Sequence, residues 1–355
     1  MSRAALVVLA LTLACSDPAA DVVDAGSADG AEPLAPDGAA SDGAAPADAA
    51  PSDAAPTSTD GFVPADAEPP PPAASTCRGY ATRYWDCCKA HCGWSGNATE
   101  LGTALASCSI DDVPQAGFDQ PSSCGSDAAD AGYTCFSMAP RAVTETLAYG
   151  FAAVPAAGAV CGRCYRLDFD GTGHYDPADP GSATLAGKTM IVQATNIGHD
   201  VGGGQFDILI PGGGVGLFNA CTRQWGLESD ALLGAQYGGF LTACKEAGGS
   251  HDQVRSCVRT RCEQVFDEPR FADLRAGCEW FVDWYAAADN PNLDWSEVAC
   301  PADLVGLSGL DRRPLDDVAL CAGGEGGECE CDCAWAAGGC GEDDGSCCWD
   351  ACCGE

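Results

Sequence analysis

The sequence predicts an all-β domain with minor helices, in which a β-barrel carries long loops tied together by disulfides. Three observations support this fold class: 25 cysteines in 355 residues, short stretches of alternating apolar and polar residues, and glycine-rich or proline-rich segments between those stretches. So many cysteines in a chain of this length indicate an oxidising compartment and a disulfide framework.

The alternating stretches predict the strands of the barrel. Their residues are rich in β-branched and aromatic side chains and are bounded by turn-forming segments such as 202–204 and 211–214. The predicted strands are 164–169, 189–194 and 205–210. Helical patterns are few, and the two best ones predict helices within 243–266 and 295–306.

The first fifteen residues are typical of an export signal. Arg3 precedes an apolar stretch, residues 4–14, that is too short to span a bilayer. Ala14 then precedes Cys15, as at a bacterial lipoprotein cleavage site, although Thr12 stands where an aliphatic residue is usual. We expect a signal peptide over 1–15 and a lipid on Cys15, which would place the protein at the cell surface or outer membrane. The alternative is plain secretion.

Two further segments flank the predicted folded domain, which spans residues 76–313. Residues 16–75 are rich in Ala, Asp and Pro and contain no Lys or Arg, which predicts a disordered linker. Residues 314–355 form an acidic tail rich in cysteine, with too little apolar mass for a core. For this tail the sequence leaves open a disulfide knot, a metal site and a small polysaccharide-binding module. The cysteines of the tail, together with Cys77, form an even set. The net charge of −35 argues against nucleic acid as a partner.

One candidate for chemistry is Asp86. It lies within a run from Thr82 to Trp94, directly before two adjacent cysteines and close to Tyr84, Trp85 and Trp94. Aromatic faces can stack on sugar rings while a carboxylate acts at the bond that is cleaved. A turn residue that holds the cysteine corner is the simpler interpretation of Asp86.

A second candidate is Asp207, which stands inside an otherwise apolar strand. Burial disfavours the charged form of a carboxyl group, so its pKa rises and it becomes a better proton donor near neutral pH. Two carboxyls in different environments are the usual equipment for glycoside hydrolysis. The simpler interpretation of Asp207 is a buried aspartate that caps backbone amides.

Both motifs, 82–94 and 202–218, closely resemble those of the family 45 glycoside hydrolases, which are endoglucanases. The resemblance implies a six-stranded double-psi β-barrel, with Asp86 as general base, Asp207 as general acid and Asp200 as an assisting carboxylate. The family inverts at the anomeric carbon, which implies a carboxyl separation of roughly 6.5–9.5 Å. We expect no cofactor and no metal.

The resemblance also implies a set of substrate-binding residues. These are Thr82, Tyr84, Trp85, Lys89, Trp94, Gln205 and Phe218. Gln205 is a departure, because the family often has histidine two residues before the acid. This difference could alter the position or the pKa of Asp207.

Six disulfides follow from the family pattern: Cys87–Cys221, Cys88–Cys124, Cys92–Cys161, Cys108–Cys135, Cys164–Cys300 and Cys244–Cys278. A further family pair is missing, since Gly162 and Leu310 stand in its place. Cys257 and Cys262 fall in a segment that looks like an insertion, so we expect them to pair with each other.

The predicted function is therefore endo-acting hydrolysis of β-1,4-glucosidic bonds in cellulose and related β-glucans, by a protein expected to be a monomer. The alternative is a non-catalytic, expansin-like protein that binds or loosens polysaccharide. Expansin-like proteins resemble this barrel and keep an acid-like aspartate, but typically lack the base. Asp86 in its full motif favours the enzyme.

Overall fold

The computed structural model describes residues 69–71, 76–156, 159–198 and 200–312. The predicted signal peptide with Cys15, all of the predicted linker except residues 69–71, and the tail beyond residue 313 lie outside the described residues. Within the described part of the chain, no helix is both long and apolar enough to cross a membrane.

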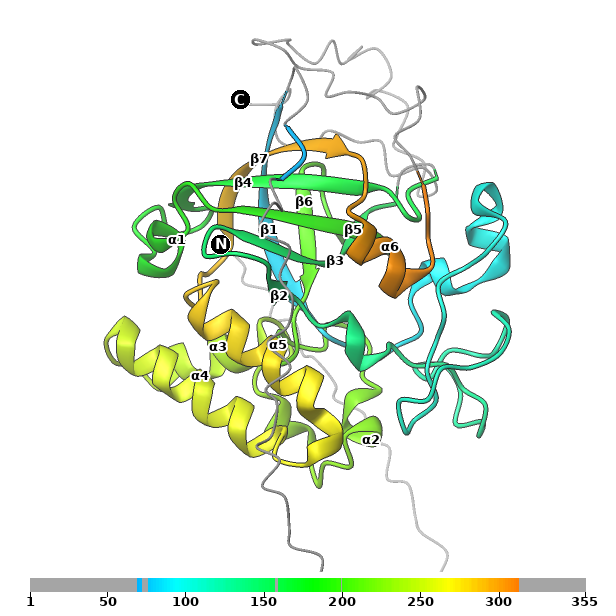
Figure 1. Ribbon diagram of the computed structural model, residues 1–355. Coiled ribbons are helices and arrows are strands. Elements are labelled where there is room, and N and C mark those ends of the chain that lie inside the picture. Colours follow the sequence, from blue (N-terminus) through cyan, green and yellow to red (C-terminus); the bar gives the residue numbers. More distant parts are fainter. Residues whose placement is uncertain (1–68, 72–75, 157–158, 199, 313–355) are drawn as a thin grey trace, which may run out of the picture. The chain divides into compact units, whose positions relative to one another are not determined.

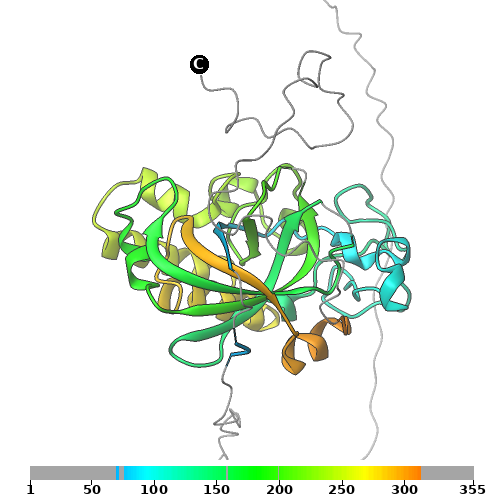
Figure 2. The same cartoon turned by 90° about the horizontal axis from the view of Figure 1, so that it is seen from above.

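The described residues form a single sheet that closes into a ring of six strands. The strands are β1 (Cys77–Tyr84), β3 (Leu147–Pro155), β4 (Cys164–Gly173), β5 (Thr189–Gly198), β6 (Gln205–Leu209) and β7 (Pro291–Val298). They run in the order β3-β5-β4-β7-β1-β6, and β6 pairs again with β3. The short β2 (Arg141–Ala142) pairs with β3 outside the ring. Closure satisfies the backbone of every barrel strand and confirms the predicted six-stranded barrel (Figures 1 and 2).

Two of the strand pairings are parallel, and they join segments far apart in sequence. β1 pairs with β6 and β3 pairs with β5 in parallel, whereas the other pairings in the ring are antiparallel. Parallel neighbours cannot be joined by a tight turn, so long crossover segments are required. The loops that cover the barrel are therefore a consequence of its topology.

The helices are short and lie outside the barrel. They are α1 (Pro180–Thr184), α2 (Cys221–Gln224), α3 (Gly239–Glu246), α4 (His251–Val265), α5 (Ala272–Asp283) and α6 (Ala302–Ser308). Single 3₁₀ turns are η1 (His91–Gly93), η2 (Ser95–Asn97), η3 (Thr99–Leu101), η4 (Phe136–Met138), η5 (Asp230–Leu233) and η6 (Pro269–Phe271). Figure 1 shows α3, α4 and α5 packed together on one side of the barrel.

Both helix predictions need correction. The stretch 243–266 is broken between α3 and α4 at Gly248 and Gly249, which have positive φ, and Ser250 then caps α4 with Gln253. The stretch 295–306 is not one helix, because β7 runs to Val298 and α6 begins only at Ala302. β7 lies inside the ring and pairs with both β1 and β4, and this long-range pairing overrides the local helical pattern.

Five of the expected disulfides are present in the described residues. They are Cys87–Cys221, Cys88–Cys124, Cys92–Cys161, Cys108–Cys135 and Cys164–Cys300. Four of them have at least one cysteine in the segment between β1 and β2, where the chain has only 3₁₀ turns and isolated bridges.

The predicted pairs Cys244–Cys278 and Cys257–Cys262 are wrong. The structure joins Cys244 to Cys257 and Cys262 to Cys278. Cys257 and Cys262 both lie on α4, five residues apart, which separates them by about 7.5 Å along the axis and by about 140° around it. Such a pair cannot form a disulfide without distorting the helix. Each cysteine instead reaches a different neighbouring helix, so α4 is fastened to α3 on one side and α5 on the other.

Candidate active site

The end of β1 and the two residues that follow it alternate between half-buried and buried positions. Thr82, Tyr84 and Asp86 are half-buried, whereas Arg83 and Trp85 between them are buried. This is the two-residue period of an extended strand. Trp85 is only 1% exposed and belongs to the core, so its prediction as a substrate-stacking residue is wrong.

Parallel pairing of β1 with β6 brings the two sequence motifs together. Thr82 stands opposite Asp207 and Tyr80 opposite Gln205. Paired residues of neighbouring strands point to the same face, so Asp207 joins Thr82 and Tyr84 there. Asp86 comes four residues after Thr82, or about 13 Å along an extended strand. The two carboxyls therefore belong to one face with space between them.

Asp86 is held at a constrained corner. The backbone N–H of Cys88 donates a hydrogen bond to Asp86 Oδ1 at 2.9 Å, and Asp86 O accepts one from the N–H of Ala220. Cys87 has a φ of 62°, a left-handed conformation that is costly for a residue with a Cβ. Disulfides from Cys87 and Cys88 hold this conformation. Burial raises the pKa of the Asp86 carboxyl to about 6 against the effect of the Cys88 N–H.

Asp207 lies in a more strongly perturbing environment. Burial is the largest cause, and it raises the pKa of the Asp207 carboxyl to about 7. The Thr82 hydroxyl, which donates to Asp207 Oδ1 at 2.7 Å, opposes this increase. The negative charge of Asp200 raises the pKa further, Arg83 lowers it, and Asp86 raises it. Asp200 is exposed, and it acts on Asp207 through its charge.

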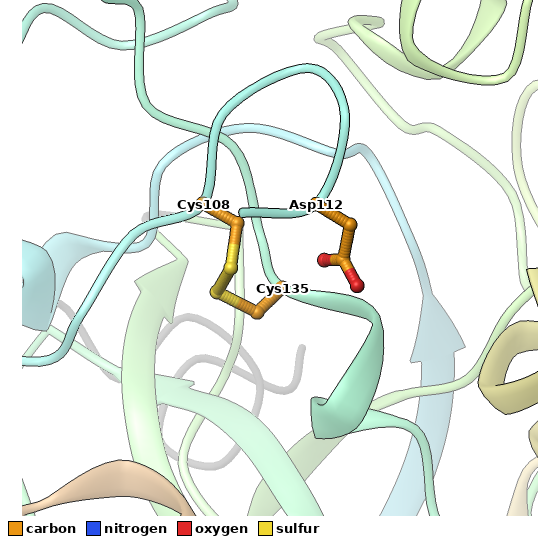
Figure 3. Close-up of side chains that lie close together, drawn as sticks. All are labelled: Cys108, Asp112 and Cys135. Atoms are coloured by element: carbon orange, nitrogen blue, oxygen red, sulfur yellow. A yellow bond between two sulfur atoms is a disulfide. The ribbon is translucent and has the colours of Figure 1, made fainter. Parts of the chain in front are cut away.

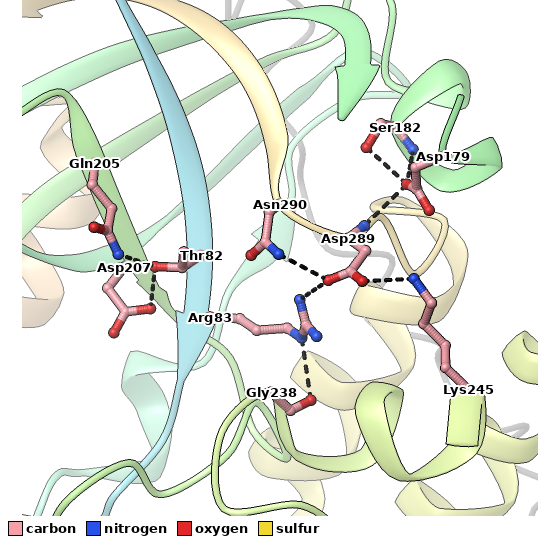
Figure 4. Close-up of polar contacts among 10 residues, drawn as sticks. All are labelled: Thr82, Arg83, Asp179, Ser182, Gln205, Asp207, Gly238, Lys245, Asp289 and Asn290. Carbon is pink, nitrogen blue, oxygen red and sulfur yellow. Dashed lines mark hydrogen bonds and ion pairs between the residues drawn. The ribbon is translucent and has the colours of Figure 1, made fainter. Parts of the chain in front are cut away.

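A chain of hydrogen bonds connects Tyr80 to Asp207 through Gln205 and Thr82, and Figure 4 shows Gln205, Thr82 and Asp207. The hydroxyl of Tyr80 donates to Gln205 Oε1 at 3.0 Å, and Gln205 Nε2 donates to Thr82 Oγ1 at 3.0 Å. Gln205 thus contacts the carboxyl of Asp207 through Thr82. Tyr80 itself stacks on His174, with ring centroids 3.8 Å apart.

The predicted aromatic residues divide into two kinds. Phe218 is 59% exposed, beside Leu217 at 69%, so both can contact a large ligand. Trp94 is half-buried, and the ammonium of Lys89 lies 3.7 Å from its ring centre. Lys89 is buried and also donates to the carbonyls of Phe118 and Gln120, at 2.6 and 2.8 Å. Lys89 therefore covers one face of the Trp94 ring.

Sequence reasoning missed two polar residues on this face. Asn196 of β5 accepts a hydrogen bond from the N–H of His91 at 2.8 Å and donates from Nδ2 to the Tyr84 hydroxyl at 3.2 Å. The phenol hydrogen of Tyr84 is then directed to another acceptor. Tyr80 lies two residues before Thr82, and the strand period would have indicated its place.

Arg83 was also missed, and it lies on the opposite face of β1. Its guanidinium donates to Asp289 Oδ1 at 2.9 Å and to the carbonyl of Gly238, while Lys245 of α3 binds Asp289 Oδ2 at 2.6 Å (Figure 4). The N–H of Asp289 donates to Asp179, which caps α1. This network joins β1 to α1 and α3 behind the candidate site.

One cluster of potential metal ligands occurs in the described residues, and it does not favour a metal. Cys108 and Cys135 lie near Asp112, but their sulfurs form a disulfide (Figure 3). Metal binding by cysteine requires a thiolate. Asp112 instead accepts the backbone N–H of Phe136 at 2.8 Å, so the cluster secures a loop.

The chain is similar to proteins named endoglucanases. Endoglucanase B of Cellvibrio japonicus is 56% identical over 245 residues, which cover 68% of this chain and 47% of that protein. A putative endoglucanase type K of Fusarium oxysporum is 37% identical over 244 residues, covering 68% of this chain and 55% of that protein. The chain thus spans about half the length of these two relatives.

A solved structure and a family model match the same region. The crystal structure of a cellulase from the Antarctic springtail Cryptopygus antarcticus is 33% identical, with a TM-score of 0.52, over 67% of this chain and 98% of that chain. Its likeness fits a double-psi β-barrel. Residues 78–311 match the model of glycosyl hydrolase family 45. The chain therefore belongs to glycosyl hydrolase family 45.

Proposed function

We propose that this chain is an endo-β-1,4-glucanase that hydrolyses cellulose and related β-glucans with inversion. The observation that carries the proposal is the pairing of Thr82 with Asp207, which brings two carboxyls with raised pKa values to one face. Family membership and relatives named endoglucanase support the same substrate class.

In this proposal Asp207 is the general acid and Asp86 the general base. Between about pH 6 and pH 7 Asp86 is ionised while Asp207 still holds its proton. Asp86 takes a proton from a water as the water oxygen bonds to the anomeric carbon. The carbon–oxygen bond breaks, its electron pair stays on the leaving oxygen, and Asp207 protonates that oxygen. Asp200 assists by favouring the protonated form of Asp207.

A test of the pair uses two isosteric variants. Asp86→Asn and Asp207→Asn should each abolish turnover and leave oligosaccharide binding largely intact, because each removes a proton acceptor or donor but little volume. Proton NMR of fresh digests should show the α-anomer first, as single displacement on a β-glucan requires. An initial β-anomer would contradict the mechanism.

The alternative function is non-catalytic binding or loosening of polysaccharide. Asp86, its tight corner and its raised pKa favour the enzyme, because a binding protein has no use for a base at this position. Release of reducing sugar from carboxymethylcellulose decides between the two. If the oxidised, folded protein binds the polymer but releases no reducing sugar, the non-catalytic function is the correct one.

We also propose that the protein is exported and acts as a monomer. The disulfides of the described residues support an oxidising compartment. A lipid on Cys15 would anchor the mature chain, and the acidic linker of residues 16–75 would hold domain 76–313 away from the membrane. Mass spectrometry of the mature N-terminus tests this, since an unmodified N-terminus beyond residue 15 excludes the lipid.

For the cysteine-rich tail, residues 314–355, we propose a role separate from catalysis. Its disulfides or metal-binding thiolates would make a small independent unit. Removing residues 321–355 should leave activity on soluble glucan unchanged, and loss of activity on insoluble cellulose alone would indicate polysaccharide binding. Thiol titration of the unfolded, unreduced protein separates a knot from a metal site.

A further inference from the structure

The side-chain amide of Gln205 has only one orientation that satisfies its neighbours. The backbone N–H of Gly202 lies 3.0 Å from Gln205 Oε1, and a backbone N–H can only donate. The amide oxygen must therefore face Gly202, where it also accepts from the Tyr80 hydroxyl. It follows that the NH₂ group faces Thr82 Oγ1, 3.0 Å away.

This orientation decides where the hydroxyl hydrogen of Thr82 goes. Thr82 Oγ1 accepts from Gln205, so its own hydrogen is free for Asp207 Oδ1 at 2.7 Å. An oxygen that accepts this hydrogen along the line to Thr82 cannot also donate along the same line. When Asp207 is protonated, its proton therefore resides on Oδ2. Figure 4 shows this second oxygen turned away from Thr82.

We propose that Gln205 is a positioning residue for the acid: acting through Thr82, it keeps the proton of Asp207 on Oδ2, the oxygen that delivers it to the leaving group. Tyr80 and Gly202 hold Gln205 in the orientation that this requires. This inference rests on the proposed function, because it assigns a role to the acid of that reaction.

The arrangement favours the transition state as well as the correct tautomer. In the chemical step the bond between Oδ2 and its proton breaks, and the proton bonds to the leaving oxygen as that oxygen receives the electron pair of the glycosidic bond. Asp207 becomes an anion while Thr82 still donates to Oδ1. A hydrogen bond to an ionised acceptor is stronger than one to a neutral acceptor, so this contact gains strength as the proton leaves.

We call the two hydrogen bonds from Gln205 to Thr82 and from Thr82 to Asp207 the relay. Other groups that face Asp207 also affect its pKa. The carboxylates of Asp200 and Asp86 raise its pKa, and the guanidinium of Arg83 lowers it from the opposite face of β1. The phenols of Tyr80 and Tyr84 lie on the same face as Asp207. None of these groups is removed by substitution at Gln205, so a change in pH dependence reports on the relay.

Two variants at Gln205 test the proposal. In Gln205→Glu, both carboxylate oxygens accept, so the Thr82 hydroxyl turns from Asp207 to the new side chain. In Gln205→Met, no group forces the hydroxyl toward Asp207, and the proton of Asp207 can move to Oδ1 and bond to Thr82. Both changes favour protonated Asp207, so we expect the basic limb of kcat/KM against pH to move upward. In Gln205→Glu the hydrogen bond from Thr82 to ionised Asp207 is lost, which corresponds to a shift of about one to two pH units. In Gln205→Met we expect a smaller shift in the same direction, because Thr82 can still donate to the ionised carboxylate.

Gln205→Glu adds a negative charge that also raises the pKa of Asp207, whereas Gln205→Met does not. Variants of Thr82 and a double variant test whether the effect of Gln205 passes through the Thr82 hydroxyl. Thr82→Val should raise the basic limb by a similar amount, and Thr82→Ser should restore it. In the Thr82→Val background, Gln205→Met should add almost nothing, because its effect passes through the missing hydroxyl. We expect kcat to fall about tenfold in Gln205→Met with little change in KM, since only the acid is disturbed.

The outcomes distinguish this inference from the proposed function. If the unaltered protein releases no reducing sugar, the proposed function fails. If it is active but Gln205→Met leaves the basic limb and kcat unchanged, the relay is absent. Full additivity of Gln205→Met and Thr82→Val would likewise overturn it, because Gln205 would then act independently of Thr82.

Discussion

Asp207 should make the folded protein less stable at neutral and alkaline pH, and replacing it should reverse this effect. The carboxyl is half-buried, and its surroundings favour the neutral form. Asp207→Asn keeps the size of the side chain and an acceptor for Thr82, but it cannot ionise. We therefore expect the variant to unfold at higher urea concentration than the unaltered protein above pH 7, although it lacks the acid.

The size of the effect follows from the pKa. Folding raises the pKa of Asp207 from 3.8 to about 7. Between these values the folded state binds more protons than the unfolded state, so the free energy of unfolding falls as pH rises through this window. A difference of about three units corresponds to at most about 4 kcal/mol, at about 1.4 kcal/mol per unit. Because the side chain keeps some contact with water, we expect roughly 2–4 kcal/mol.

The assay is equilibrium unfolding in urea of the oxidised protein at pH 4 and at pH 8. The stability of Asp207→Asn relative to the unaltered protein should increase between these two values by the amount above. Asp200→Asn is the matched control, since it removes an exposed carboxylate whose charge also acts on Asp207 and should give a much smaller difference. If the two variants respond equally to pH, burial does not set the pKa of Asp207 and the reasoning is refuted.

Three other predictions follow. The profile of kcat/KM against pH should be a narrow bell whose limbs lie near the pKa values of about 6 and about 7 given for Asp86 and Asp207, and limbs several units apart would contradict the assignment. Trp94→Ala should raise KM for long oligosaccharides with little loss of stability. Trp85→Ala should cost about 3–5 kcal/mol of unfolding free energy because it empties a core position. Urea unfolding curves of both variants would show this difference in stability. Cys257→Ser should free the thiol of Cys244 and no other, which peptide mapping after thiol labelling would detect, and a free thiol at Cys262 would contradict the observed pairing.

The sequence sufficed to identify the family, the barrel and the candidate carboxyls. These depend on short motifs in which neighbouring residues carry most of the information, such as the aromatic run before Asp86. Disulfides anchored in those motifs were also predictable, since the positions of Cys87 and Cys88 fix their partners within the family pattern. The resemblance contributed as much here as the physical pattern of the residues.

Errors arose where a local pattern was read without its long-range partner. The predicted pair Cys257–Cys262 is wrong because their partners, Cys244 on α3 and Cys278 on α5, are brought to α4 only by the packing of the three helices. The sequence marked Gln205 as a departure from the family, but it could not show the orientation of its amide, which depends on the N–H of Gly202 and the hydroxyl of Tyr80. Such contacts are set by backbone geometry and leave no signal in residue type.

The burial of Trp85 shows that the register of β1 decides which side chains reach the candidate active site. Adjacent residues of a strand point to opposite faces, so Trp85 and Asp86 cannot both face the substrate. A slip of one residue in β1 would expose Trp85 and Arg83 and would bury Asp86 in an apolar core. Arg83 opposes that slip, because its ion pair with Asp289 forms only when its side chain points to the core. Removing one partner of such a buried pair typically costs about 3–5 kcal/mol. The buried charge behind β1 therefore stabilises the register that places Thr82, Tyr84 and Asp86 at the candidate active site.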